Sequence, residues 1–121
     1  LMHSGDELPQ VAENADLKAA IMEMSAKGMG MTAVVDAEQK AIGIITDGDL
    51  RRILQHADHI NGVSVQGIMG VQPKTIQTNK LASEALHVMQ TKRVNGLLVV
   101  DEEQRLVGAL HMHDLLKAGI V

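Results

Sequence analysis

The chain repeats a stretch of its own sequence, and this repeat limits its possible folds more than any other feature. AVVDAEQKAIGIITDGDL, residues 33–50, recurs without a gap as LVVDEEQRLVGALHMHDL, residues 98–115. Upstream, three more residues recur in the same order: Ala20, Met24 and Lys27 as Ala85, Met89 and Lys92. Recurrence over this length predicts two copies of one structural unit.

Each copy predicts the same order of elements. A proline-led extended segment comes first, and a helix follows whose apolar residues share one face: Leu17, Ala20, Ile21 and Met24, or Leu81, Ala85, Leu86 and Met89. Two apolar strands joined by a short polar turn come next, so each strand pair should be antiparallel. These strands are expected at 32–35 and 41–45, and at 97–100 and 106–110. A last helix, 47–55 or 112–118, closes each copy.

The expected fold class is therefore α+β: two β-α-β-β-α repeats packed sheet to sheet with pseudo-two-fold symmetry. A unit of about fifty residues buries too little surface to be stable alone, so the copies should share a core. We expect 1–55 to form the first repeat, 56–70 the linker and the start of the second, and 71–121 the rest of the second repeat.

Composition restricts the function. The 121 residues are 45% apolar but contain no Phe, Tyr or Trp, so the core must be aliphatic, and the eight methionines, including those at 22, 24, 29 and 31, should help to fill it. The net charge of −4 argues against nucleic-acid or membrane-surface binding. No apolar run approaches the ~20 residues of a membrane span, and there is no signal-peptide pattern and no cysteine, so we expect a cytoplasmic protein.

A tandem β-α-β-β-α unit that ends in G-h-h-T-x-x-D-L, where h is apolar, resembles the cystathionine-β-synthase-type (CBS) domain pair. The resemblance rests on VVDAEQKAIGIITDGDL and VVDEEQRLVGALHMHDLL, with PKTI opening the second copy. MHSGDELPQV, TDGDLRR and ALHMHDLLKAGIV look more specifically like the C-terminal CBS pair of bacterial arabinose-5-phosphate isomerases. That resemblance implies a non-catalytic regulatory fragment and, in the longer chain, an N-terminal sugar-isomerase domain that serves the synthesis of Kdo, a lipopolysaccharide sugar.

Thr46 and Asp49 have the spacing of a helix capping box, a role that needs no ligand. The same strand-to-helix turn also offers backbone N–H groups to an anion, and Gly48 allows a close approach. The resemblance implies that Thr46 meets a phosphate and Asp49 a ribose. The two interpretations are compatible, and both stay open on the sequence alone.

The second copy keeps Asp114 but has His111 in place of the threonine, so we expect two unequal clefts, with the better nucleotide site in the first copy. In the family each cleft takes residues from both copies. The walls implied for the first cleft are Thr75 and the VNGL stretch: Val94, Asn95, Gly96 and Leu97. Gly28–Met31 would line the second. Of the two arginines after Asp49, we expect Arg52 to bind the anion, because Lys117 matches it in the second copy.

Several alternatives compete for this site. No metal is expected, because a structural zinc site wants four ligands and there is no cysteine; the remaining histidines, His3 among them, should be surface residues. No cofactor is expected beyond a nucleotide or nucleotide-sugar ligand, for which CMP-Kdo is the first choice and AMP or ATP the second. The other possibility is a ligand-free module that forms a homo-oligomer, most simply a dimer, through its apolar helices.

Overall fold

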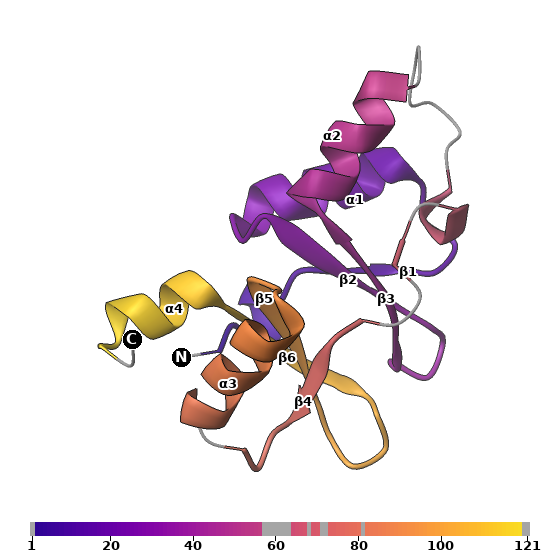
Figure 1. The fold of residues 1–121 in the computed structure, drawn as a ribbon. Coiled ribbons are helices and arrows are strands. Elements are labelled where there is room, and N and C mark those ends of the chain that lie inside the picture. Colours follow the sequence, from indigo (N-terminus) through magenta and orange to yellow (C-terminus); the bar gives the residue numbers. More distant parts are fainter. Residues whose placement is uncertain (1, 57–63, 68, 71–72, 81, 120–121) are drawn as a thin grey trace.

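A computed structural model describes residues 2–56, 64–67, 69–70, 73–80 and 82–119 of the chain. The first half contains β1 (Gln10–Ala12), α1 (Leu17–Lys27), β2 (Met31–Val35), β3 (Ala41–Thr46) and α2 (Asp47–His56). The second half contains β4 (Thr75–Gln77), α3 (Ala82–Lys92), β5 (Gly96–Val100), β6 (Leu106–His111) and α4 (Met112–Lys117). Short 3₁₀ helices cover Gly5–Glu7 and Val65–Gly67. Figure 1 shows the two halves as two lobes, each with its own sheet and pair of helices.

The two sheets have the same topology, which confirms the predicted repeat and its α+β class. In each sheet the first strand is parallel to the second, and the second is antiparallel to the third. The polar turns between the last two strands are also identical. Asp36 Oδ1 accepts the amide N–H groups of Glu38 and Lys40, both at 2.9 Å, and Asp101 Oδ1 accepts the equivalent pair at the same distances. These bonds give the aspartate that begins D-x-E-Q the same role in both copies.

The start of each copy crosses to the other sheet. His3 exchanges backbone hydrogen bonds with Ala109 of β6, at 2.7 and 2.9 Å, and Gly70 exchanges the equivalent pair with Ile44 of β3, at 2.9 and 3.2 Å. Each crossing places a methionine over a glycine: a Cβ on Gly108 would lie 2.5 Å from Met2 Sδ, and one on Gly43 would lie 2.8 Å from Met69 Cγ. The two repeats are therefore interlocked as well as packed together.

The core has one shared part and one part under the helices of each lobe. The shared cluster joins the facing sheets: its buried members are Leu8, Met29, Met31, Ala33, Val35, Leu98, Leu106 and Ala109. Two further clusters lie under α1 and under α3 and α4. Met24, Met29 and Met31 are buried as expected, but Met22 is 63% exposed, because it lies on the outer face of α1. The expected sheet-to-sheet packing thus rests on aliphatic and methionine side chains.

Helix α1 has clear sequence signals at both ends. Asp16 caps its start and accepts a hydrogen bond from the Ala19 amide at 2.9 Å. At the other end Gly28 has a left-handed backbone conformation, with φ of 68°, which favours glycine. Gly30 follows with φ of 71°, so the chain turns sharply between α1 and β2. This turn carries Met29 and Met31 to the space between the lobes.

Candidate ligand cleft between the repeats

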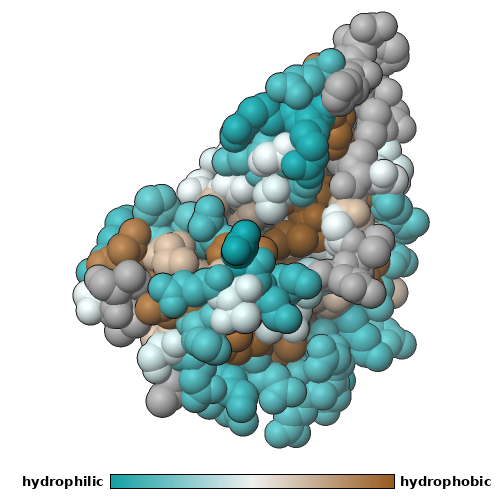
Figure 2. Space-filling view, viewed as in Figure 1, coloured by the Kyte–Doolittle hydropathy of each residue, from teal (hydrophilic) through white to brown (hydrophobic). Residues whose placement is uncertain are grey.

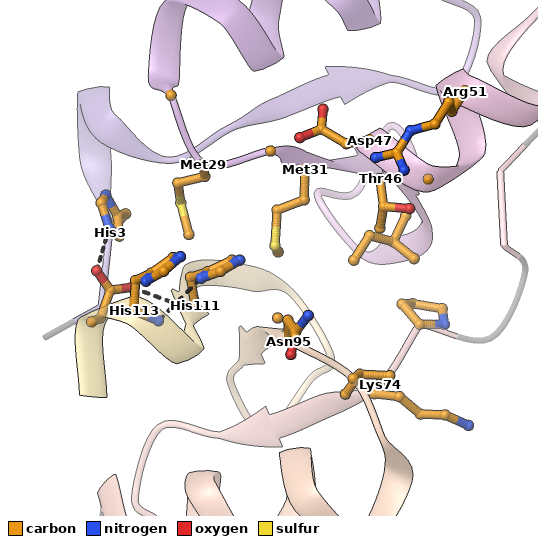
Figure 3. Close-up of a pocket in the computed structure, with 18 of the residues that line it drawn as sticks. His3, Met29, Met31, Thr46, Asp47, Arg51, Lys74, Asn95, His111 and His113 are labelled. Atoms are coloured by element: carbon orange, nitrogen blue, oxygen red, sulfur yellow. Dashed lines mark hydrogen bonds and ion pairs between the residues drawn. The ribbon is translucent and has the colours of Figure 1, made fainter. Parts of the chain in front are cut away.

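A cleft of about 950 Å³ lies between the two lobes. Figure 2 shows apolar surface at the junction of the two lobes, flanked by hydrophilic surface on both sides. In the close-up, His3, His111 and His113 gather at one end of the cleft, while Thr46, Asp47 and Arg51 lie at the other (Figure 3). Met31 lines the middle, opposite Asn95, and Met29 lies beside it, opposite His111. The cleft therefore has two polar ends and an apolar centre. The other lining residues are Gly28, Gly30, Ile44, Gly48, Pro73, Lys74, Val94, Gly96, Asp114 and Lys117.

At the first-repeat end, Thr46 and Asp49 form the predicted capping box. Asp49 Oδ2 accepts the Thr46 amide N–H at 2.8 Å and its hydroxyl at 3.0 Å, and the Asp49 amide donates to Thr46 Oγ1 at 3.3 Å. The other carboxylate oxygen of Asp49 accepts a hydrogen bond from Arg52. Thr46 lines the cleft and Asp49 does not. The carboxylate that we expected to meet a ribose is thus engaged within α2.

At the second-repeat end, the equivalent acid is Asp114, and it does line the cleft. Its Oδ2 accepts the His111 amide at 2.8 Å, and its Oδ1 accepts His3 Nε2 at 3.0 Å. His111 Nδ1 accepts the His113 amide at 3.1 Å, and the two rings stack with centroids 4.9 Å apart. Burial lowers the pKa of His111, and His113 lowers it further, although Asp114 acts in the opposite direction. At neutral pH the ring is therefore uncharged, with its proton on Nε2.

A comparison with known families decides what this architecture is. The CBS domain model matches residues 2–56 and 65–120, one match for each repeat. The chain belongs to the CBS domain family. The resemblance inferred from the repeated motif is thereby confirmed.

Individual relatives agree with this assignment. The CBS pair is 47% identical over all 121 residues to arabinose 5-phosphate isomerase KdsD of Pseudomonas aeruginosa, and it spans 37% of the length of that relative. A CBS-domain protein from Burkholderia ambifaria is 29% identical over 93% of this chain and 82% of its own, with a TM-score of 0.80. The cytosolic domain of the Mg²⁺ channel MgtE, solved with ATP, is 25% identical over 98% of this chain and 46% of its own, with a TM-score of 0.77.

The cation of α2 that faces the cleft of the CBS pair is not the one that we expected. We expected Arg52, but Arg51 lines the cleft, because Asp49 holds Arg52 three residues further along the same helix. Lys117, the second-repeat match of Arg52, does reach the cleft. Lys74 also lines it and had not been predicted. Cationic side chains thus come from both repeats, which suits an anionic ligand.

The implied walls are present in part. Val94, Asn95 and Gly96 line the cleft, but Leu97 is fully buried in the cluster under α3, and Thr75 is paired within the second sheet. The turns on both sides are held by matching bonds: the Asp47 amide donates to Gly30 O at 3.0 Å, and the Met112 amide donates to Asn95 O at 2.7 Å. These bonds occupy the first amide of each closing helix. Two unequal clefts were expected, whereas the lining residues surround one continuous space with unequal ends.

His3 is the main residue that the sequence did not indicate. It was expected at the surface, yet it lines the cleft from a position far from the repeat motif. No local pattern marks it, because its placement depends on the crossing of residues 2–3 to β6. Among the described residues, no group of three or more His, Asp or Glu side chains is arranged to hold a metal ion. Within the same part of the chain, no helix is long and apolar enough to cross a membrane.

Proposed function

We propose that this CBS pair is the regulatory, nucleotide-binding module of an arabinose-5-phosphate isomerase. The observation that carries the proposal is the cleft itself, which has cationic residues from both repeats and an apolar centre. Arg51 and Lys117 suit phosphate oxygens, while Met29, Met31 and Val94 suit the face of a base. The 47% identity to an isomerase supports a sugar-isomerase domain as the partner in a longer, cytoplasmic chain.

The ligand proposed first is CMP-Kdo, the activated end product of the pathway that the isomerase resemblance implies. Its phosphate and its sugar carboxylate would each meet a cationic end of the cleft. Adenine nucleotides are the alternative: the MgtE domain was solved with ATP, and two more distant CBS proteins, CBSX2 and one from Pyrobaculum aerophilum, were solved with AMP. A ligand regulates the isomerase only if it binds two states of the chain with different affinity.

Isothermal titration calorimetry with CMP-Kdo, CMP, AMP and ATP tests the proposal and ranks the ligands. Cytidine and adenosine serve as controls that lack the phosphate. The Arg51→Ala variant should weaken phosphate-containing ligands by about 1.5–3 kcal/mol, the range for a hydrogen bond to a charged group. Lys92→Ala is the matched control, because Lys92 is an exposed cation of α3 outside the cleft. Folded protein that releases no heat with any of the four nucleotides would refute nucleotide sensing.

Exposed leucines on the closing helices support a second candidate, a ligand-independent assembly module. Leu54 of α2 is 57% exposed and Leu116 of α4 is 48% exposed. Apolar side chains of this size on outer helices suit contact with a second copy of the chain. Sedimentation velocity of the wild type and of Leu54→Lys, with and without AMP, separates the two functions. A dimer that ignores nucleotide and is lost in the variant would favour the assembly role.

A further inference from the structure

The two repeats pair their equivalent aspartates, Asp49 and Asp114, in different ways. In the first repeat, the free oxygen of Asp49 pairs with Arg52 of the same helix, a local contact. In the second, Oδ1 of Asp114 pairs with His3, which lies 111 residues away in sequence. Lys117 matches Arg52 but lines the cleft instead. His3 therefore gives Asp114 the side-chain partner that Arg52 of α2 gives Asp49.

This contact links the cleft to the start of the chain. His3 lines the cleft through its side chain while its backbone is bonded to Ala109 of β6. Met2 lies over Gly108 on the same strand. The side chains of His3 and Asp114 are 29% and 17% exposed, so the pair is accessible from the cleft without being fully solvated. Whatever disturbs the pair acts directly on the segment that contains residues 2 and 3.

We propose that the contact of His3 with Asp114, called the latch below, holds residues 2–3 in place, and that a ligand with vicinal hydroxyl groups displaces His3 from Asp114. This inference rests on the proposed nucleotide-binding function. Asp114 Oδ2 already accepts the His111 amide, so Oδ1, which accepts His3 Nε2 from the side of the cleft, is the oxygen more open to a ribose hydroxyl. A hydroxyl that donates to Oδ1 competes with His3 Nε2 for the same atom. Occupation of the second-repeat end thus loosens residues 2–3, the segment that would lead from the proposed isomerase domain into the CBS pair.

The latch predicts that His3 opposes binding. Removing a partly exposed contact of this kind should tighten AMP binding by about two- to fivefold in His3→Ala, since the ligand no longer displaces the imidazole. His3→Gln keeps a side-chain hydrogen-bond donor but not the imidazole ring, so its affinity should lie between those of the wild type and His3→Ala. The two variants should affect 2′-deoxy-AMP less than AMP, because it lacks one of the competing hydroxyls.

The release of residues 2–3 is measured in an experiment separate from the binding assays. The chain has no cysteine, so Ser4→Cys offers a single site for a nitroxide label, and Ser4 makes no side-chain capping bond that the change would remove. Saturating AMP should increase the mobility of this label in electron paramagnetic resonance spectra. A label at Ser25→Cys, on the exposed surface of α1, should not respond. Without nucleotide, adding His3→Ala should mobilise the Ser4 label.

The outcomes separate the two proposals. If no variant binds AMP, CMP-Kdo or ATP, the proposed function fails and the ligand-driven release fails with it. If AMP binds the wild type but His3→Ala binds equally well or more weakly, the latch is refuted while nucleotide binding stands. Tighter binding by His3→Ala together with a mobilised Ser4 label supports the latch.

Discussion

Substitution of Gly43 by alanine tests the interlocking of the two repeats. Gly43 is buried on β3, opposite Val34, under the crossing segment that carries Met69. A Cβ at Gly43 would lie 2.8 Å from Met69 Cγ and 3.1 Å from the carbonyl oxygen of Gly70. Both are inside the ~3.5–4.0 Å of favourable carbon contacts. Met69 Cγ is one bond from its own Cβ, so the clash is not relieved by moving only the end of the side chain.

Overpacking of this kind costs about 1–3 kcal/mol, partly offset by about 0.5–1 kcal/mol from replacing a strand glycine. We therefore expect Gly43→Ala to lower the free energy of unfolding by about 0.5–2 kcal/mol. The assay is urea unfolding followed by far-UV circular dichroism, because the chain has no aromatic residue to report by fluorescence. Gly67→Ala is the matched control, since its Cβ meets nothing within 4 Å, and it should change stability by less than about 0.5 kcal/mol.

A double-mutant cycle with Met69→Ala identifies which contact causes the loss of stability in Gly43→Ala. If Met69 is the side chain that Gly43→Ala displaces, the double variant should be at least about 1 kcal/mol more stable than the sum of the single effects predicts. Strict additivity, or a Gly43→Ala protein as stable as Gly67→Ala, would refute the crossing of residues 69–70 over β3.

Two further predictions concern the ends of the cleft. The pKa of His111 is lowered in the folded protein, so the wild type should lose stability relative to His111→Asn as pH falls through the ordinary histidine value of about 6.5. The difference in stability should level off below the folded pKa. Parallel curves of stability against pH, measured by chemical denaturation, would contradict this prediction. Asp49→Ala removes the capping acceptor of Thr46 and should destabilise the protein by about 0.5–2 kcal/mol, whereas Asp47→Ala, which keeps that acceptor, should cost less; equal losses in thermal unfolding would argue against the cap.

The repeated sequence predicted most of the fold, because periodic apolar residues and polar turns are local features. The strands around Val34 and Val99 and their antiparallel partners follow directly from that pattern. The crossings of residues 2–3 and 69–70 could not be predicted in the same way. Each involves a bridge of only a residue or two, too short for a periodic signal, and each depends on the other repeat being in place.

The sequence predicted some of the residues that line the cleft, but not all of them. The capping box at Thr46 and Asp49 was readable from spacing, since it is a contact within one turn. That same contact misled the choice between the arginines: Asp49 captures Arg52 and leaves Arg51 for the cleft. His3 reaches Asp114 across nearly the whole length of the chain, and no single-sequence pattern encodes such a pair. Local chemistry was therefore easier to predict than contacts made by tertiary packing.

Nuclear magnetic resonance mapping of the nucleotide site tests the central claim most directly. The ¹⁵N-labelled protein is titrated with AMP and with CMP-Kdo, and amide shift changes are recorded for every assigned residue. The account predicts that the largest changes fall on Gly30, Gly48, Asn95 and His113, which line the cleft from both repeats. Changes confined to the hairpin turns at 36–40 and 101–105, or no changes at saturating ligand, would contradict a nucleotide site between the repeats.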